Sequence, residues 1–497
     1  MIAYLLSALA ITWASLVALD RFLSIPHQLN EPPRILPKVP FIGHIIGMIQ
    51  HGSNYYEILT KRSGLPIYTI YLPGSKIYVV TSPNLVTAID RRSKTISFGP
   101  YVLSVDLLAE DLLEDDGPVG LRPETLKVMH ESLAPGDDLQ AITRVMLRRV
   151  AEHLEALHCR EDAVVAGLFD WTRKFVTRAS TDAIYGPSNN PFHKEDVYNA
   201  LWTIDREFVL LGLNILPNIL SPKGARGRRV FFEAMSKYYA AGHHKTASPL
   251  VQARHQVESK YGMPQKDMEH FNLSVSYGLL VNTVPSSAWV LYHVYSQPSL
   301  LSDVRQTIDS LVRIEGSTDV RVNLPDVIKA YPLLESLVQE VLRLHSTNAS
   351  GRVVLRDTLI GDKYLLRKDA ILLILSKGMH SNTEVWGPTA STFDPTRFLK
   401  QRAGRDPHRV PASAYRAWGS GASVCPGRYF ATNEILSILI IMVLRYNVSP
   451  VRGEWKMPAT KSHITTSILT PVTDIDVHIR PRKETSGIQW TFTWETE

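Results

Sequence analysis

The sequence has only two cysteines, Cys159 and Cys425, among its 497 residues. Two cysteines cannot build a disulfide framework, so a disulfide-stapled secreted protein is excluded and a reducing compartment is indicated. The chain has no long run of lysine or arginine, which argues against nucleic acid as a partner. It also lacks a Gly-x-Gly-x-x-Gly fingerprint, so it carries no recognisable nicotinamide or flavin domain of its own.

The charge that is present is mixed in sign. With 54 Lys and Arg against 48 Asp and Glu, the net charge is +6. This mild basic excess suits an anionic membrane surface or an acidic protein partner, and a solvated mixed surface explains it equally well. Hydrophobic residues make up 44% of the chain and charged residues 21%, as in a globular protein with an additional apolar segment.

The N-terminus predicts a membrane anchor. Residues 1–19 contain no charged side chain, and this length is enough to cross a bilayer core as a helix. A cleaved signal peptide is the alternative, but no basic residue precedes the apolar run. Because basic residues follow the run, the positive-inside rule places the main body in the cytosol. We therefore expect a retained anchor over residues 1–21.

A proline-rich hinge is expected next, over residues 22–45. Prolines at this density make a stiff, extended linker that would hold a globular body in one pose on the membrane. A plain exposed loop is the alternative. The prolines concerned are Pro26, Pro32, Pro33, Pro37 and Pro40.

The remaining residues, 46–497, predict one mainly α domain with small β-sheets. Two strands, 67–72 and 77–81, are expected to form a hairpin, followed by a short helix over 84–92. From about residue 123 to 297 the pattern is mainly helical, with loops rich in Pro, Gly and Asn. No repeat and no low-complexity tract is present.

The most informative stretch is a glycine-bearing loop, residues 418–427, that ends in a cysteine just before an apolar run over 429–444. That run predicts a buried helix. Backbone N–H groups and the positive end of a helix dipole favour an anion at such a position, so Cys425 should lose its proton easily and bind a metal. Pro426 has no N–H, so the donors should come from Gly427 onward. An inert buried cysteine is the alternative.

The loop resembles the haem-binding loop of the cytochrome P450 family. The shared pattern is aromatic-x-x-Gly-x-x-x-Cys-x-Gly, carried by Trp418, Gly421, Cys425 and Gly427. The resemblance implies the P450 fold and haem b, with the Cys425 thiolate as the axial ligand of the iron. Gly421 would take backbone angles closed to other residues, and Gly427 would leave room for a flat group.

Two residues of the loop depart from the family pattern. Trp418 stands where the family usually has Phe, and its ring can still cover the sulfur side of the haem. Ser423 stands where the family usually has Arg or His on a haem propionate, so another cation must do that work. Arg352, at the start of a predicted strand, is the candidate that the resemblance implies. His380 resembles a loop histidine of the family that can also approach a propionate.

Residues 268–296 predict one long helix that contains the turn Leu279-Leu280-Val281-Asn282-Thr283-Val284-Pro285. Pro285 removes a backbone N–H and distorts the turn before it. The family has its oxygen-activating groove at a matching place, with an acid before the threonine. Here the threonine is kept as Thr283, but Asn282 stands at the position of the acid. The amide of Asn282 can position water but is a poor acid or base. A self-capped kink is the alternative reading.

Glu340 and Arg343 share one face of a helix predicted over 331–345. Alone, such a pair is usually a surface ion pair of little value. Residues 393–398 resemble the family's Pro-Glu-Arg-Phe segment, and this resemblance implies that Arg397 joins Glu340 and Arg343 in a network behind the haem. We assign these residues to assembly of the haem pocket rather than to chemistry.

The resemblance implies an oxygen-inserting enzyme at the endoplasmic reticulum. The anchor and hinge are similar to those of microsomal P450s, with the domain in the cytosol and electrons from NADPH-cytochrome P450 reductase. The Asn-Thr-x-Pro turn resembles the one in the family branch that contains oxysterol hydroxylases and prostacyclin synthase. The sequence as a whole resembles the divergent P450 enzymes of fungal secondary metabolism. Mostly apolar segments would line the substrate pocket and favour a lipophilic molecule; by position they are 98–108, 208–220, 279–285, 346–350 and 465–469.

Two alternatives remain open. Without the acid, the turn also allows a haem-thiolate isomerase or dehydratase that acts on a peroxide and needs no reductase. Outside enzymes, the chain could be a haem-binding sensor or carrier.

Overall fold

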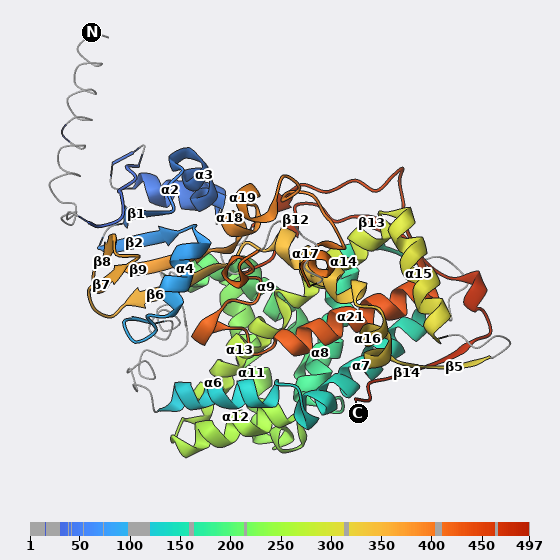
Figure 1. Cartoon of the computed structure of the whole chain (residues 1–497). Coiled ribbons are helices and arrows are strands. Elements are labelled where there is room, and N and C mark those ends of the chain that lie inside the picture. The colour runs from blue at the N-terminus through green and yellow to red at the C-terminus, as the bar shows by residue number, and fades with distance from the viewer. Residues whose placement is uncertain are drawn as a thin grey trace, which may run out of the picture.

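The computed structural model describes residue 15 and residues 30–37, 39–40, 42–52, 54–72, 74–97, 120–158, 164–212, 216–312, 318–402, 410–462 and 466–496. The predicted anchor over 1–21, apart from residue 15, and the predicted pocket segment 98–108 lie outside these residues. Among the described residues, no helix combines the length and apolar character needed to span a bilayer. The predicted mainly α fold with small β-sheets is confirmed (Figure 1).

The core of the helical body is built from five helices. They are α7 (Asp137–His158), α8 (Leu168–Tyr185), α14 (Thr283–Tyr295), α17 (Leu333–His345) and α21 (Arg428–Arg445). Helix α21 packs against α7, α14 and α17, and α14 packs against α8. Because α21 is apolar on every side, it is buried along nearly its whole length. It extends the predicted buried helix by one residue at each end.

A five-stranded sheet forms the other lobe. Its order is β1-β2-β9-β6-β3, with β1 (Ile67–Leu72), β2 (Ser75–Val80), β9 (Ile371–Leu375), β6 (Ala349–Val354) and β3 (Ile96–Ser97). The predicted hairpin is the antiparallel pair β1–β2, and its second strand begins two residues earlier than expected. Strand β2 pairs parallel with β9, so segments far apart in the chain, blue and orange in Figure 1, lie side by side.

Two helices cover the two faces of this sheet. Alternate residues of β2 face opposite sides, so Tyr78 packs with Val86 of α4 (Pro83–Asp90), while Val79 packs with Leu59 of α3 (Asn54–Ser63). The alternation fixes the register of the sheet, which carries Arg352 on β6.

Part of the predicted hinge packs against the sheet. The backbone of Ile35 donates to Thr69 on β1 at 2.9 Å, and the Thr69 N–H donates to Pro33 at 2.8 Å. Glu31 is buried and accepts from Lys76 at 2.7 Å and from Tyr78 at 2.8 Å. The pose of the N-terminal segment on the sheet is therefore set by hydrogen bonds rather than by proline stiffness alone.

The C-terminal segment closes the helical body. Strand β14 (Gln489–Thr493) pairs parallel with β5 (Asp319–Asn323), and the Trp494 carbonyl accepts from Arg144 Nε at 3.0 Å. The other small sheets are β10 (Tyr446–Pro450) with β13 (Asp476–Pro481) and β4 (Val164–Gly167), β7 (Thr358–Ile360) with β8 (Tyr364–Leu366), and β11 (Thr460–Lys461) with β12 (Thr470–Pro471).

The remaining helices are α2 (Gly43–His51), α6 (Leu121–Ser132), α9 (Glu195–Gly212), α10 (Pro217–Leu220), α11 (Pro222–Ala240), α12 (Pro249–Lys260), α13 (Gln265–Leu280), α15 (Pro298–Val312), α16 (Leu324–Ala330), α18 (Ser376–His380), α19 (Thr383–Trp386) and α20 (Arg397–Arg402).

The expectation of one long helix over 268–296 is wrong. Helix α13 ends at Leu280 and α14 begins at Thr283, so two residues, Val281 and Asn282, separate them. The physical reason is Pro285, which cannot donate to the carbonyl four residues earlier. The distortion expected from this proline therefore interrupts the helix instead of only bending it.

Candidate active site

The loop over residues 418–427 folds back on itself immediately before α21. The Cys425 N–H donates to the Trp418 carbonyl at 2.8 Å. Gly419 and Gly421 have φ values of 75° and 55°, which side chains rarely allow, as expected for Gly421. A Cβ on Gly419 would lie 2.5 Å from the Ser423 carbonyl oxygen, so the loop can close only with glycine there.

The Cys425 sulfur lies at the N-terminus of α21, where Gly427 is the N-cap residue. Backbone N–H groups of Gly427 and Arg428 hydrogen-bond to the sulfur, as expected from the position of Pro426. They lower the pKa of the thiol, but burial has the larger effect and raises it overall. The expectation that the protein alone ionises this thiol easily is therefore wrong, because desolvation outweighs the helix terminus. A cation bound to the sulfur would reverse this balance.

Glu340 lies between two guanidinium groups, all of them buried. Arg343 donates from Nε to Oε2 at 2.7 Å and from Nη2 to Oε1 at 2.8 Å. Arg397, the first residue of α20, donates from Nε to both oxygens at 3.1 Å. The other donors end on backbone carbonyls, among them those of Ala390 for Arg343 and Thr389 for Arg397. The structure thus brings together the three residues that the P450 resemblance groups.

Arg352 reaches from β6 to the cysteine loop. It donates from Nη2 to Ser423 Oγ at 2.6 Å and from Nη1 to Ser350 Oγ at 2.8 Å. Its Nη2 also lies 3.8 Å from Oδ1 of Asp90, at the end of α4. Burial lowers the pKa of Arg352 to about 10, which still leaves the group charged at neutral pH.

A second buried arginine, Arg416, approaches the other oxygen of Asp90. Its Nη1 is 3.5 Å from Asp90 Oδ2, and the same oxygen accepts from Ser420 at 2.7 Å. Sequence reasoning missed both Asp90 and Arg416. A charged residue two positions before Trp418 was a usable signal for Arg416, whereas nothing local marks Asp90.

His380 is packed beneath the loop. Its Nε2 accepts from the Arg416 backbone N–H at 2.9 Å, and its carbonyl accepts from Arg343 at 2.5 Å. Burial lowers the pKa of His380 to about 3, so the ring is neutral. The ring supports the loop backbone and offers no positive charge to a carboxylate.

The two residues at the helix break are held differently. Thr283 Oγ1 donates to the Leu279 carbonyl at 2.9 Å, so the hydroxyl lies along the end of α13. Asn282 Oδ1 accepts from the Ser467 N–H at 2.7 Å and thereby ties the break to the segment after residue 465. The described part of that segment, 466–469, is one of the predicted pocket walls.

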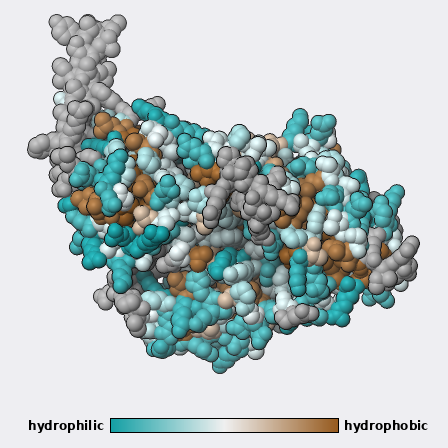
Figure 2. All heavy atoms as spheres, viewed as in Figure 1, coloured by the Kyte–Doolittle hydropathy of each residue, from teal (hydrophilic) through white to brown (hydrophobic). Residues whose placement is uncertain are grey.

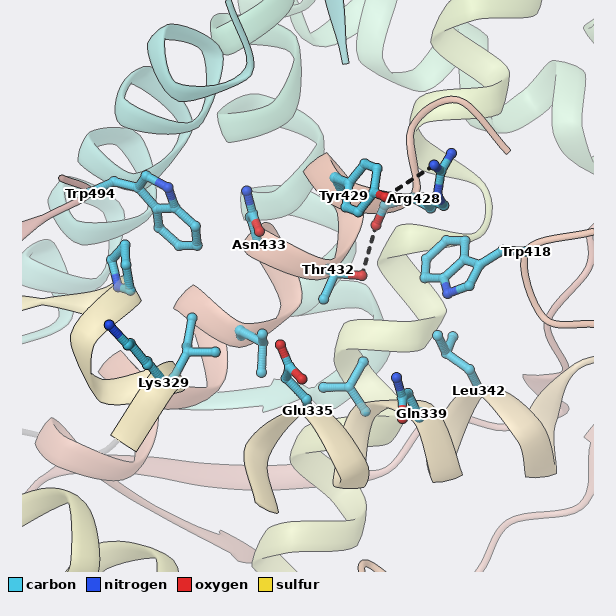
Figure 3. A pocket seen from close by; sticks show the side chains of 14 residues that line it. Lys329, Glu335, Gln339, Leu342, Trp418, Arg428, Tyr429, Thr432, Asn433 and Trp494 are labelled. Atoms are coloured by element: carbon cyan, nitrogen blue, oxygen red, sulfur yellow. Dashed lines mark hydrogen bonds between the residues drawn. The ribbon is translucent and has the colours of Figure 1, made fainter. Parts of the chain in front are cut away.

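A cavity of about 530 Å³ lies beside the cysteine loop, between α16, α17 and α21 (Figure 3). Trp418, Arg428 and Trp494 are among its walls, and none of its lining residues belongs to the predicted substrate segments. Arg428 Nη1 donates to the Cys425 carbonyl at 3.0 Å. This cavity is therefore distinct from the predicted substrate pocket.

Comparison with known proteins identifies the architecture. The family model for Cytochrome P450 matches residues 33–477. The chain belongs to the cytochrome P450 family. It is 35% identical to "Cytochrome P450 monooxygenase nodJ" of Hypoxylon pulicicidum, over 93% of this chain and 92% of that protein. It is thus an enzyme of the P450 monooxygenase type.

More distant P450 relatives come from fungi and from mammals. A "Cytochrome P450 monooxygenase" of Gibberella zeae is 26% identical over 93% of this chain and 91% of its own length. The human "7-alpha-hydroxycholest-4-en-3-one 12-alpha-hydroxylase" is 23% identical over 90% of this chain and 93% of its own length. The expected likeness to oxysterol hydroxylases is therefore confirmed.

The P450 family implies a haem-thiolate cofactor, and the residues present fit it. Among the residues that the structure describes, the Cys425 sulfur is the one atom that a Cβ on Gly427 would meet within 4 Å, at 3.9 Å, so these residues leave space for a flat group beside the thiol. The described residues hold no cluster of three His, Cys, Asp or Glu that could bind a metal ion. In the P450 family, haem supplies the other ligands of an iron that one cysteine binds.

Proposed function

We propose that this P450 is a haem-thiolate monooxygenase that inserts one oxygen atom from dioxygen into a lipophilic small molecule. The observation that carries the proposal is Cys425 itself. Its sulfur receives two backbone N–H groups at a helix N-terminus and lies beside open space at Gly427. When bound there, haem b supplies dioxygen binding and O–O cleavage.

The surrounding residues would position the cofactor. Cys425 would bind the iron as thiolate, with Trp418 on its sulfur side and Gly421 and Gly427 allowing close approach. Arg352, buried on a strand, would bind a propionate. The Glu340–Arg343–Arg397 network would hold the segments behind the loop in place.

The first experiment is a carbon monoxide difference spectrum of the purified, reduced holoprotein. We expect a strongly red-shifted Soret band, because Cys425, as a thiolate ligand, would donate electron density to the iron. A band at the ordinary histidine-ligated position would show that Cys425 is not the native ligand. Absence of any haem signal would support the alternative, that Cys425 is an inert buried cysteine, and would contradict the proposed function.

Thr283 would organise the water that delivers protons. Its hydroxyl hydrogen is given to Leu279, so its lone pairs remain to accept from water. Asn282 would contribute by holding residues 466–469 against the break, because its oxygen is engaged by Ser467. The proposed catalytic pair thus divides into one water-binding and one positioning residue.

Replacing Thr283 with alanine should uncouple the reaction. Peroxide released per NADPH should rise about tenfold or more with a lipophilic substrate that the wild type turns over, since proton delivery by a positioned group contributes about 10²–10⁴-fold. The haem spectrum should stay unchanged. Ser286→Ala is a matched control, because Ser286 makes the same kind of bond one turn on, to the Asn282 carbonyl at 2.7 Å. Intact coupling in the threonine variant would refute this role.

The proposed setting is the cytosolic face of the endoplasmic reticulum, with NADPH-cytochrome P450 reductase as electron donor. The exposed apolar side chains Leu36, Ile42 and Ile49 support membrane contact, and 78% of Ile49 is exposed. Figure 2 shows hydrophobic residues gathered at the end of the molecule that holds β1 and α2. The proposed role in secondary-metabolite biosynthesis rests on the resemblance in motif style alone, whereas the name of the human relative supports a steroid-like substrate.

A haem-thiolate isomerase or dehydratase is the second candidate. The observation in its favour is that position 282 carries an amide whose oxygen is already bound to Ser467, so the helix break has no acid there. Turnover of a lipid peroxide without NADPH and reductase would establish it. A strict requirement for both would establish the monooxygenase.

A further inference from the structure

Two buried arginines share a single carboxylate beside the cysteine loop. Asp90 lies 3.8 Å from Arg352 Nη2 and 3.5 Å from Arg416 Nη1. The neighbouring Ser420 and Ser423 are uncharged, and burial keeps His380 neutral. The cluster therefore carries one surplus positive charge in a place with little access to water.

Within this cluster, Arg416 has hydrogen-bond donors that are left unfilled. Its side chain is 1% exposed, yet within the described residues neither Nη1 nor Nη2 has a hydrogen-bond partner. The Glu340 cluster provides an internal comparison, since it also has two arginines to one carboxylate. There the spare donors of Arg343 end on the carbonyls of His380 and Ala390. Apart from the 3.5 Å approach of Nη1 to Asp90, the Nη groups of Arg416 meet no acceptor in the described part of the chain.

A buried guanidinium edge whose donors are not filled by hydrogen bonds has a specific chemical complement. Its two Nη groups form a planar fork that matches a carboxylate, and a second negative charge would neutralise the cluster. Arg352 places its own guanidinium 3.8 Å from the other oxygen of Asp90. The cluster is thus built to receive one more carboxylate, bound mainly by Arg416.

We propose that Arg416, together with Arg352, binds a propionate of the haem. This inference rests on the proposed haem-thiolate function and assigns the cation that Ser423 cannot supply. Ser423 instead accepts from Arg352 at 2.6 Å and fixes that side chain. The family usually has its basic group two residues before the cysteine. In this chain the proposed basic group, Arg416, stands nine residues before Cys425.

The test is the rate of haem loss from the ferric holoprotein to an excess of apomyoglobin, without substrate. Arg416→Gln should lose haem about 10–100-fold faster than wild type, the usual effect of removing an outer contact that orients a metal group. Arg416→Lys should lie between the two, because it keeps the charge without the fork. With no substrate present, faster loss assigns the carboxylate to haem rather than to a bound acid.

Arg254→Gln is the matched control. Arg254 is also 1% exposed, but it lies on α12 and pairs with Glu258 at 2.7 Å. Haem loss at the wild-type rate in Arg416→Gln, or equally fast loss in Arg254→Gln, would overturn the proposal. If Arg416→Gln fails to fold, the lysine variant decides, and a wild-type rate there overturns the proposal.

The haem-loss experiment and the carbon monoxide spectrum test the propionate assignment and the proposed function separately. Haem remaining in the Arg416 variants should still give the red-shifted band with carbon monoxide, because Cys425 is untouched. If the wild type itself lacks that band, the proposed function fails. If only the rates are unchanged, the propionate assignment alone fails.

Discussion

Replacing Cys425 with alanine should abolish the red-shifted carbon monoxide band and all oxygenase turnover. The loop offers no second sulfur, because Cys159 is the other cysteine of the chain and lies in a different segment. The fold should survive, since the loop is closed by the Cys425 N–H to Trp418 bond, which alanine keeps. The measurement is the reduced difference spectrum, with circular dichroism to show that helix content is retained.

Cys159→Ala is the control for this variant, and it should keep both the band and the activity. A Cys425→Ala protein with a normal thiolate band would contradict the assignment of the iron ligand. Loss of the band in both variants would point to general damage instead of ligation.

Replacing Glu340 with glutamine should destabilise the protein by about 3–5 kcal/mol. The carboxylate lies between Arg343 and Arg397 with all three groups buried, so its removal leaves two uncompensated guanidiniums. An amide oxygen can accept only part of the five hydrogen bonds that the carboxylate now receives, four from the two arginines and one from the Asp394 N–H. We expect a lower midpoint of urea unfolding, followed by circular dichroism, and poor haem content.

The variant Asp170→Asn tests whether burial causes the loss of stability expected for Glu340→Gln. Asp170 and Arg173 have the same i, i+3 spacing and the same order on α8, at 2.6 Å, but Asp170 is 70% exposed. Exposed pairs contribute about 0–1 kcal/mol, so the unfolding midpoint should barely move. A similar loss in both variants would show that spacing, rather than burial between two cations, sets the effect.

Local patterns predicted local structure well in this chain. The buried run after the cysteine became α21, and the alternating apolar residues around position 74 became the β1–β2 hairpin. Glu340 and Arg343 share a helix turn, so their pairing was readable from spacing. Arg397 joined them only through the family resemblance, because nothing in its own segment points to Glu340.

The features that sequence reasoning missed depend on distant partners or on competing effects. Asp90 meets Arg416 only after α4 and the cysteine loop have packed together, and no period in the sequence encodes this. For Cys425 the helix terminus was visible, but the degree of burial that raises the pKa of the thiol was not. Pro285 signalled a distortion, yet whether a helix bends or breaks depends on what holds the two ends, here Ser467 through Asn282.

The packing of α21 against α7 has a consequence for how the protein folds during its synthesis. Asn433 of α21 contacts Thr143 of α7, 290 positions earlier in the chain. While the ribosome is still making the second half, α7 can pack against α8, but the part of α7 that α21 covers in the finished fold is still exposed. Transiently exposed apolar surface of this kind favours aggregation, so the nascent chain carries this risk until α21 has been made. The cofactor, whose proposed ligand Cys425 is made almost last, can join only after translation is nearly complete.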